Sequence, residues 1–100
     1  MIVVRFKVRC RPEKAAEAMA SFRDVIAPSR ATQGVVSFDL GQDLADPNSF
    51  FAIEVFEDRA ALERQEALEQ VQKTIGLLGE LVAEDPEATI FHISSSEPWG

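Results

Sequence analysis

The chain has 100 residues, of which 46% are hydrophobic and 27% charged, and its formal net charge is −7. This balance predicts one globular domain over residues 1–100 and excludes a disordered chain. An acidic surface argues against nucleic acid as a partner, and no apolar run approaches the ~18 residues that cross a bilayer, so we expect no membrane span. Cys10 is the single cysteine. It fits a reducing compartment, and the first ten residues resemble a strand more than a signal peptide, so we expect a cytoplasmic protein.

The first third of the chain predicts a strand followed by a helix. Residues 2–10 alternate apolar and mostly charged side chains, which is the period of a half-buried strand. Pro12 suits the first position of a helix that should run to about Ile26 and stop at Pro28. Its apolar stripe would consist of Ala15, Met19, Phe22 and Ile26.

A hairpin and an acidic helix start occupy the middle of the chain. One strand should place Val36, Phe38 and Leu40 on a single face. Residues 43–49 have loop chemistry, and residues 50–56 return as a strand rich in aromatic and β-branched side chains. Residues 59–84 then predict a helix in two pieces, in which Gly76 and Gly79 would let another backbone come close.

The last strand should cover residues 88–94, after a helix stop at Asp85-Pro86. The order β-α-β-β-α-β predicts an α+β protein with the ferredoxin-like split βαβ pattern, that is, a four-stranded antiparallel sheet with helices on one face. Residues 50–56 carry aromatic side chains on both faces of their strand. An exposed aromatic sheet face favours association, so we expect a homodimer packed through the sheet faces.

Two stretches, RFKVRCRPEK (residues 5–14) and QGVVSFDLGQDLADPNSFFAIEVFEDRAALE (residues 33–63), resemble the antibiotic biosynthesis monooxygenase (ABM) family of dimeric α+β barrels. The resemblance extends over nearly the whole chain. It implies a dimer with a pocket between the helices and the sheet of each protomer. The family includes cofactor-independent oxygenases of phenols, anthrones and hydroquinones, quinol-linked enzymes and a haem-degrading branch.

The chain departs from the family at several positions. Where members commonly carry two histidines and a phenylalanine after the AAL helix start, this chain has Gln65, Gln70 and Val71. Glutamine cannot exchange a proton near neutral pH. Where the haem-degrading branch has Asn, Trp and an iron-binding His, this chain has Phe6, Gln65 and Ile75. These side chains do not ligate iron, so we expect no haem. The loop acids have turn chemistry and no Cys/His metal spacing occurs, so we expect no metal or other cofactor.

The candidate polar residues each allow two interpretations. His92, the single histidine, would accept a proton from a phenolic substrate or, more commonly for a lone histidine, be a solvated strand residue. Arg5 would hold an anionic oxygen of a quinone-like ligand; the alternative, which we prefer, is a cross-strand ion pair with Glu54 at the dimer face.

Asp39 and Gln65 would project polar atoms into a cavity that binds a small aromatic ligand. Its walls would consist of Phe6, Phe22, Phe38 and Phe56, although phenylalanines at such spacing are more often plain core. With His92, Gln65 and Asp39 as catalytic residues, the chain would be a cofactor-independent monooxygenase, an oxidoreductase whose aromatic or quinol-type substrate itself reduces oxygen. The alternative is a non-catalytic ligand-binding or accessory dimer that lacks the family's histidines.

Overall fold

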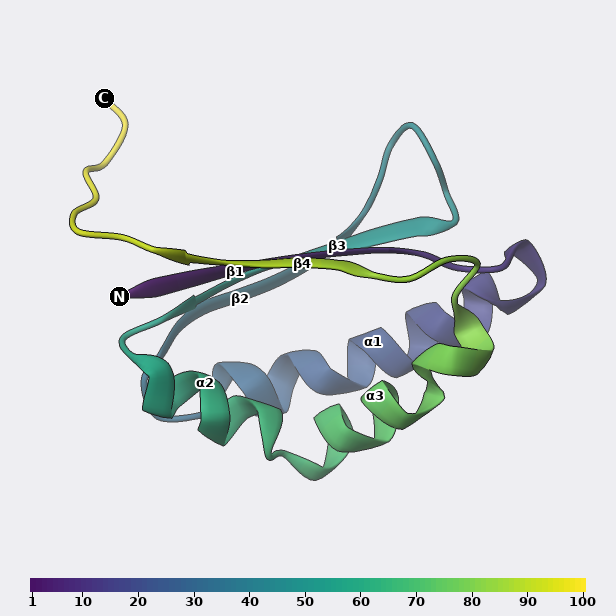
Figure 1. Cartoon of the computed structure of the whole chain (residues 1–100), viewed down its shortest axis with the longest axis horizontal. Coiled ribbons are helices and arrows are strands. Elements are labelled where there is room, and N and C mark those ends of the chain that lie inside the picture. Colours follow the sequence, from purple (N-terminus) through teal and green to yellow (C-terminus); the bar gives the residue numbers. More distant parts are fainter.

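The computed structural model describes all 100 residues and has the ferredoxin-like α+β fold that the sequence predicts. Four antiparallel strands form one sheet in the order β2-β3-β1-β4, and the helices cover one of its faces (Figure 1). The elements are β1 (Ile2–Arg9), η1 (Pro12–Lys14), α1 (Ala15–Arg30), β2 (Val35–Gln42), β3 (Ser49–Phe56), α2 (Arg59–Glu66), α3 (Glu69–Leu81) and β4 (Glu87–His92).

The strand register decides which side chains face the helices. In β1, the alternation turns Ile2, Val4 and Val8 toward the helices, where all three are buried. In β3, the same face carries Phe50, Ala52 and Phe56, and the ring of Phe50 meets Phe22 of α1 edge to face at 5.5 Å. The core therefore lies between α1, α2 and α3 on one side and the two central strands on the other.

A register shift at the start of β2 makes one predicted orientation wrong. The pairing with β3 is irregular between Val35 and Ser37, and this bulge interrupts the alternation. Val36 is therefore 54% exposed rather than on the buried face with Phe38, and Val35 packs against the core instead. The preceding Gly34 has φ +87°, and a Cβ there would lie 2.6 Å from that of Ala61 in α2.

Helix α1 continues past the predicted stop at Pro28 as far as Arg30. A proline lacks the N–H that would bond the carbonyl of Asp24, but Asp24 is exposed, so water can satisfy that carbonyl. The hydroxyl of Thr32 donates to the carbonyl of Pro28 at 2.9 Å and supports the last turn. The buried residues of α1 are Ala18, Phe22, Val25 and Ser29. Of the predicted stripe, Phe22 is among them, and Met19 and Ile26 are half-buried against the core.

The second helical region forms two helices, as predicted, with the break at residues 67–68. Asp58 caps α2 by accepting a hydrogen bond from the backbone N–H of Ala61 at 2.9 Å. A Cβ at Gly76 or Gly79 would meet nothing within 4 Å, so the predicted close backbone approach there was wrong. Helix α3 ends before Asp85-Pro86 because the chain turns at Val82 to pair with Cys10.

No helix covers the second face of the sheet, which we call the open face (Figure 1). Its exposed apolar side chains include Phe51 and Ile53 on β3 and Phe91 on β4. The C-terminal tail leaves β4 and extends away from the sheet (Figure 1), with Trp99 fully exposed. None of the helices combines the length and the apolar character that crossing a bilayer requires.

Candidate active site

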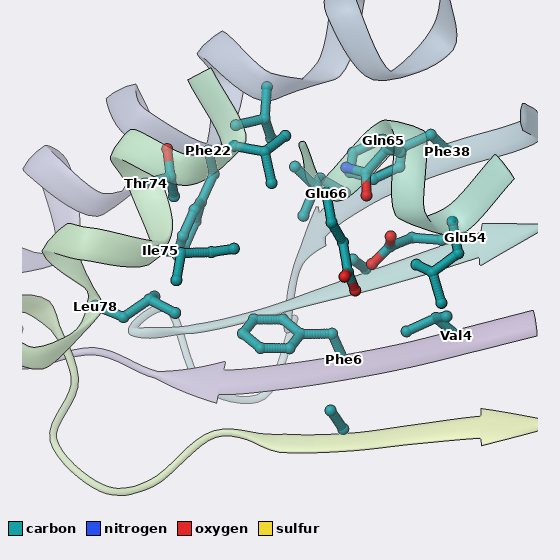
Figure 2. Close-up of a pocket in the computed structure, with 16 residues that line it drawn as sticks. Val4, Phe6, Phe22, Phe38, Glu54, Gln65, Glu66, Thr74, Ile75 and Leu78 are labelled. Atoms are coloured by element: carbon teal, nitrogen blue, oxygen red, sulfur yellow. The ribbon is translucent and has the colours of Figure 1, made fainter. Parts of the chain in front are cut away.

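A pocket lies between the helices and the sheet (Figure 2), with a cavity volume of about 230 Å³. Twelve of the sixteen residues that line it are hydrophobic, including Phe6 of β1, Phe22 of α1 and Phe38 of β2. Concave sites with mostly apolar walls and a few polar groups are the usual binding sites for small molecules. An apolar cavity of ~150 Å³ accepts benzene, so this pocket has room for one substituted aromatic ring.

The four polar residues of the lining are Glu54, Gln65, Glu66 and Thr74. No lysine, arginine or histidine is among the lining residues, so the pocket contains acidic groups without a basic partner. Thr74 of α3 directs its hydroxyl to the carbonyl of Ser21 at 3.4 Å and belongs to the contact between α3 and α1. The chemistry of the pocket therefore rests on two carboxylates and one amide.

Glu54 enters the pocket because it lies on the helix-facing side of β3, at an even position like Phe50 and Phe56. Its neighbours across the sheet are Val4 on β1 and Phe38 on β2, and its side chain is 9% exposed. Burial in these apolar surroundings, and secondarily the carboxylate of Glu66, raises the pKa of Glu54 to about 7. Near neutral pH this carboxyl group therefore exists both with and without its proton.

The predicted ion pair between Arg5 and Glu54 was wrong. Arg5 stands opposite Ile53, and its side chain lies on the open face, whereas Glu54 stands opposite Val4 and faces the helices. Neither residue takes part in any of the four ion pairs of the structure. Glu54 is consequently a buried acid with no cation beside it.

Gln65 lies on the pocket side of α2 and is 3% exposed. Its side-chain amide Nε2 donates to the hydroxyl of Ser29 at 3.0 Å, and Ser29 is fully buried in α1. This bond ties α2 to α1, fixes the amide, and leaves its oxygen turned toward the pocket (Figure 2). Gln65 can thus offer an acceptor to a ligand from a fixed position.

The predicted site residues separate into two groups. Phe6, Phe22, Phe38 and Gln65 line one pocket together. Phe56 lies outside it, in a core cluster with Ile2 and Ala61. Asp39 is on the surface, where it pairs with Arg30 at 3.2 Å, and His92 is exposed at the end of the edge strand β4. Neither Asp39 nor His92 is among the residues that line the pocket.

Sequence reasoning missed both acids of the pocket. The alternation of residues 50–56 placed Phe50 and Phe56 on the core face, and Glu54 has the same parity, so the pattern already contained an acid on an apolar face. Glu66 gave no such signal, because α2 has charged side chains at four of its eight positions and nothing in their spacing distinguishes this glutamate. No three of the chain's His, Cys, Asp and Glu side chains are grouped so that they could hold a metal ion.

The family model of antibiotic biosynthesis monooxygenases (ABM) matches residues 1–77. The chain belongs to this family. Solved structures superpose closely on this chain. A crystal structure of an antibiotic biosynthesis monooxygenase has a TM-score of 0.87 at 24% identity, and the match covers 95% of this chain and 100% of that one. PA3566 from Pseudomonas aeruginosa has a TM-score of 0.86 at 26% identity, over 94% of each chain.

Two curated relatives align with this ABM chain. Uncharacterized protein sll1783 of Synechocystis is 29% identical over 96 residues, which is 96% of this chain and 65% of that protein. The protein named "Putative monooxygenase YcnE" of Bacillus subtilis is 31% identical over 62 residues, which is 62% of this chain and 65% of that protein. Each alignment thus covers 65% of the relative's own length, which is less than two thirds. Three residues stand where the haem-degrading branch would have its Asn, Trp and iron-binding His. They are Phe6, Gln65 and Ile75, and all three line the pocket.

Proposed function

We propose that this ABM chain is a monooxygenase that oxidises a small, electron-rich aromatic compound of the phenol or quinol class in the pocket beneath its helices. The observation that carries the proposal is the pocket itself, in which apolar walls surround two carboxylates and a fixed amide. Family membership and the monooxygenase name of the relative YcnE support the same reaction class.

The walls suit one aromatic ring. Phe6, Phe22 and Phe38 come from three different elements and line a cavity of about 230 Å³. Aromatic pairs in offset or edge-to-face arrangements contribute about 0.5–1.5 kcal/mol beyond the burial of their area. In a quinol, which has two hydroxyl groups, the amide oxygen of Gln65 would accept a hydrogen bond from one of them and so orient the substrate.

The substrate supplies the electrons in this reaction. For an anthrone-type substrate, one oxygen atom of O2 becomes the new ring carbonyl, and the other leaves as water with the two hydrogens of the former CH2 group. No external reductant, metal or flavin is needed for this balance. The protein contributes binding, orientation and a proton acceptor, which are effects of position and charge.

A second candidate function is ligand binding without catalysis. The observation that favours it is Gln65, which stands where family members carry a histidine and whose amide is already bonded to Ser29. An amide cannot exchange a proton near neutral pH, so Gln65 cannot replace the histidine as an acid or a base. The pocket would then bind a ligand without catalysing its oxidation.

Oxygen uptake by the purified, metal-free protein distinguishes the two candidates. The assay would use a panel of hydroquinones and anthrones, with products followed by mass spectrometry. Catalysed uptake without added flavin or metal supports the monooxygenase. Compounds that raise the melting temperature without any uptake above the uncatalysed rate support the binding module instead.

We further propose that two copies pack through their open sheet faces. Phe51, Ile53 and Phe91 expose apolar area on that face, and the family resemblance implies a dimer. Ile53→Glu would place a charge at the centre of this face and should give a monomer in light scattering. Leu44→Glu, in the exposed β2–β3 loop, should leave the dimer intact. A wild-type monomer at micromolar concentration contradicts the proposal.

A further inference from the structure

We propose that Glu54, with Glu66 beside it, is the proton acceptor of the pocket and makes the pocket select ligands with a neutral hydroxyl group over anionic ones. The proposal rests on the pocket of the proposed function and names the chemical class of its ligand. Glu54 and Glu66 belong to different elements, β3 and α2, and both line the cavity. Figure 2 shows their carboxyl groups extending into the same space between the sheet and the helices.

Glu54 has an unfavourable position for folding. A buried carboxylate is normally paired with a cation or saturated with hydrogen bonds, since its desolvation is otherwise costly. Glu54 forms no ion pair, and the residues that flank it across the sheet are Val4 and Phe38. Nothing in the packing of the core requires an acid here, so we attribute the acid to the pocket.

Glu66 is the last residue of α2. The C-terminal end of a helix carries partial negative charge and disfavours acidic side chains. The amide of Gln72 binds the backbone carbonyl of Glu66, so α3 fixes this end of α2 at the pocket. Glu66 therefore holds a second negative charge at the cavity, although the local electrostatics of the helix oppose it.

The charges around Glu54 define what it can do. Of the elements that line the pocket, α2 contributes Glu66, and the lining residues from α1, α3, β1, β2 and β4 are apolar apart from the neutral Thr74. No cation stabilises the ionised form of Glu54, and its pKa is raised to about 7. A base with a pKa near the working pH combines adequate ionisation with adequate proton affinity.

The step is a simple proton transfer. The ionised carboxylate of Glu54 accepts the hydrogen bond of the ligand's ring hydroxyl. It then takes that proton, and the electron pair of the broken O–H bond stays on the ligand oxygen. A carboxylate ligand would bring a third negative charge into a cavity that has no positive group, so binding of benzoate-type compounds is disfavoured.

Calorimetric titration with probes of matched shape tests the proposal apart from any oxygen chemistry. The probes are 4-ethylphenol, its methyl ether and 4-ethylbenzoate, none of which needs to be oxidised. Because the phenol binds ionised Glu54, its affinity should fall about thirtyfold between about pH 8.5 and about pH 5.5, since a pKa of about 7 governs the ionised fraction. The ether should show no such dependence, and the benzoate should bind at least tenfold more weakly than the phenol.

Three variants complete the experiment. Glu54→Gln should bind the phenol with no pH dependence, and Glu66→Gln should move the midpoint of the profile to lower pH and admit the benzoate. Glu57→Gln, at an exposed glutamate just beyond β3, is the matched control and should behave as the wild type. The proposal is overturned if wild-type protein does not bind the phenol, if it binds the benzoate equally well, or if Glu54→Gln keeps the wild-type pH profile.

The outcomes separate this inference from the proposed function. Phenol binding that depends on Glu54, in a protein that consumes no oxygen, supports the inference and rejects the monooxygenase. Oxygen consumption that keeps its rate and pH profile in Glu54→Gln supports the monooxygenase and rejects the inference.

Discussion

Replacing Glu54 by glutamine should change the way in which the stability of the protein depends on pH. The pKa of Glu54 is raised from its ordinary value of 4.5 to about 7, because burial and the neighbouring Glu66 disfavour its charged form. Glu54 thus holds its proton more tightly in the folded chain, and unfolding releases that proton between about pH 4.5 and about pH 7. The free energy of unfolding therefore falls as the pH rises through this window, and the loss is complete above about pH 7.

The size of this effect follows from the two pKa values. The gap between 4.5 and about 7 corresponds to about 3 kcal/mol. Glutamine has nearly the same shape and does not titrate, so the Glu54→Gln variant lacks this loss. Relative to the wild type, its free energy of unfolding should rise by about 3 kcal/mol between about pH 4.5 and about pH 8.

Urea denaturation at a series of pH values, at one fixed protein concentration, measures this difference directly. The titration of all other acids cancels when the variant is compared with the wild type at each pH. Glu57→Gln should give a difference that does not vary with pH. If Glu54→Gln and Glu57→Gln show the same flat difference, Glu54 titrates normally and the argument for a buried, unpaired acid fails.

Four further variants test the local structure of the helices and the turns that frame the site. Gly34→Ala should destabilise the protein by about 1–3 kcal/mol, since Gly34 has φ +87° and no space for a Cβ. Gly79→Ala, in an open part of α3, should stabilise the protein by about 0.5–1 kcal/mol. Urea denaturation of both variants measures these changes. Ser29→Ala should cost about 1–3 kcal/mol, because it leaves the buried amide of Gln65 without its acceptor, and unchanged thermal unfolding would contradict that bond. Asp58→Ala should cost about 0.5–2 kcal/mol through loss of the α2 cap, again read from the melting curve.

The fold was predictable because periodicity and turn chemistry agreed along the chain. Alternating patterns gave the strands, and the order of elements gave the split βαβ sheet that the structure confirms. The predictions were wrong where the local backbone departs from the regular pattern of its element. The bulge at the start of β2 turned Val36 outward, and Pro28 stayed inside the last turn of α1, where it removes only one helical hydrogen bond. Neither effect is visible in a pattern of apolar spacing.

Sequence spacing placed three of the four predicted wall residues in the candidate pocket, but not Phe56 and not most of the polar groups. Phe6, Phe22, Phe38 and Gln65 meet in one pocket because each lies on a core-facing position of its element. His92 was chosen for its chemistry, but an exposed place at the end of an edge strand keeps it out of the pocket lining. Glu54 was paired with Arg5 because of its charge. The alternation of side chains along β3 already placed Glu54 on the same face as the buried Phe50 and Phe56.

Oxygen uptake by the wild type and by a variant with a filled pocket tests the central claim most directly. Ala88 of β4 stands opposite Phe6 and lines the pocket from an exposed position, so Ala88→Phe should occupy the cavity without disturbing the core. Glu80→Phe, on the exposed side of α3, is the matched control. With a hydroquinone or anthrone that the wild type oxidises, we expect Ala88→Phe to lose uptake, with an unchanged melting temperature, and Glu80→Phe to retain it. Uptake that is absent in the wild type, or that persists in Ala88→Phe, would show that this pocket is not the site of oxidation.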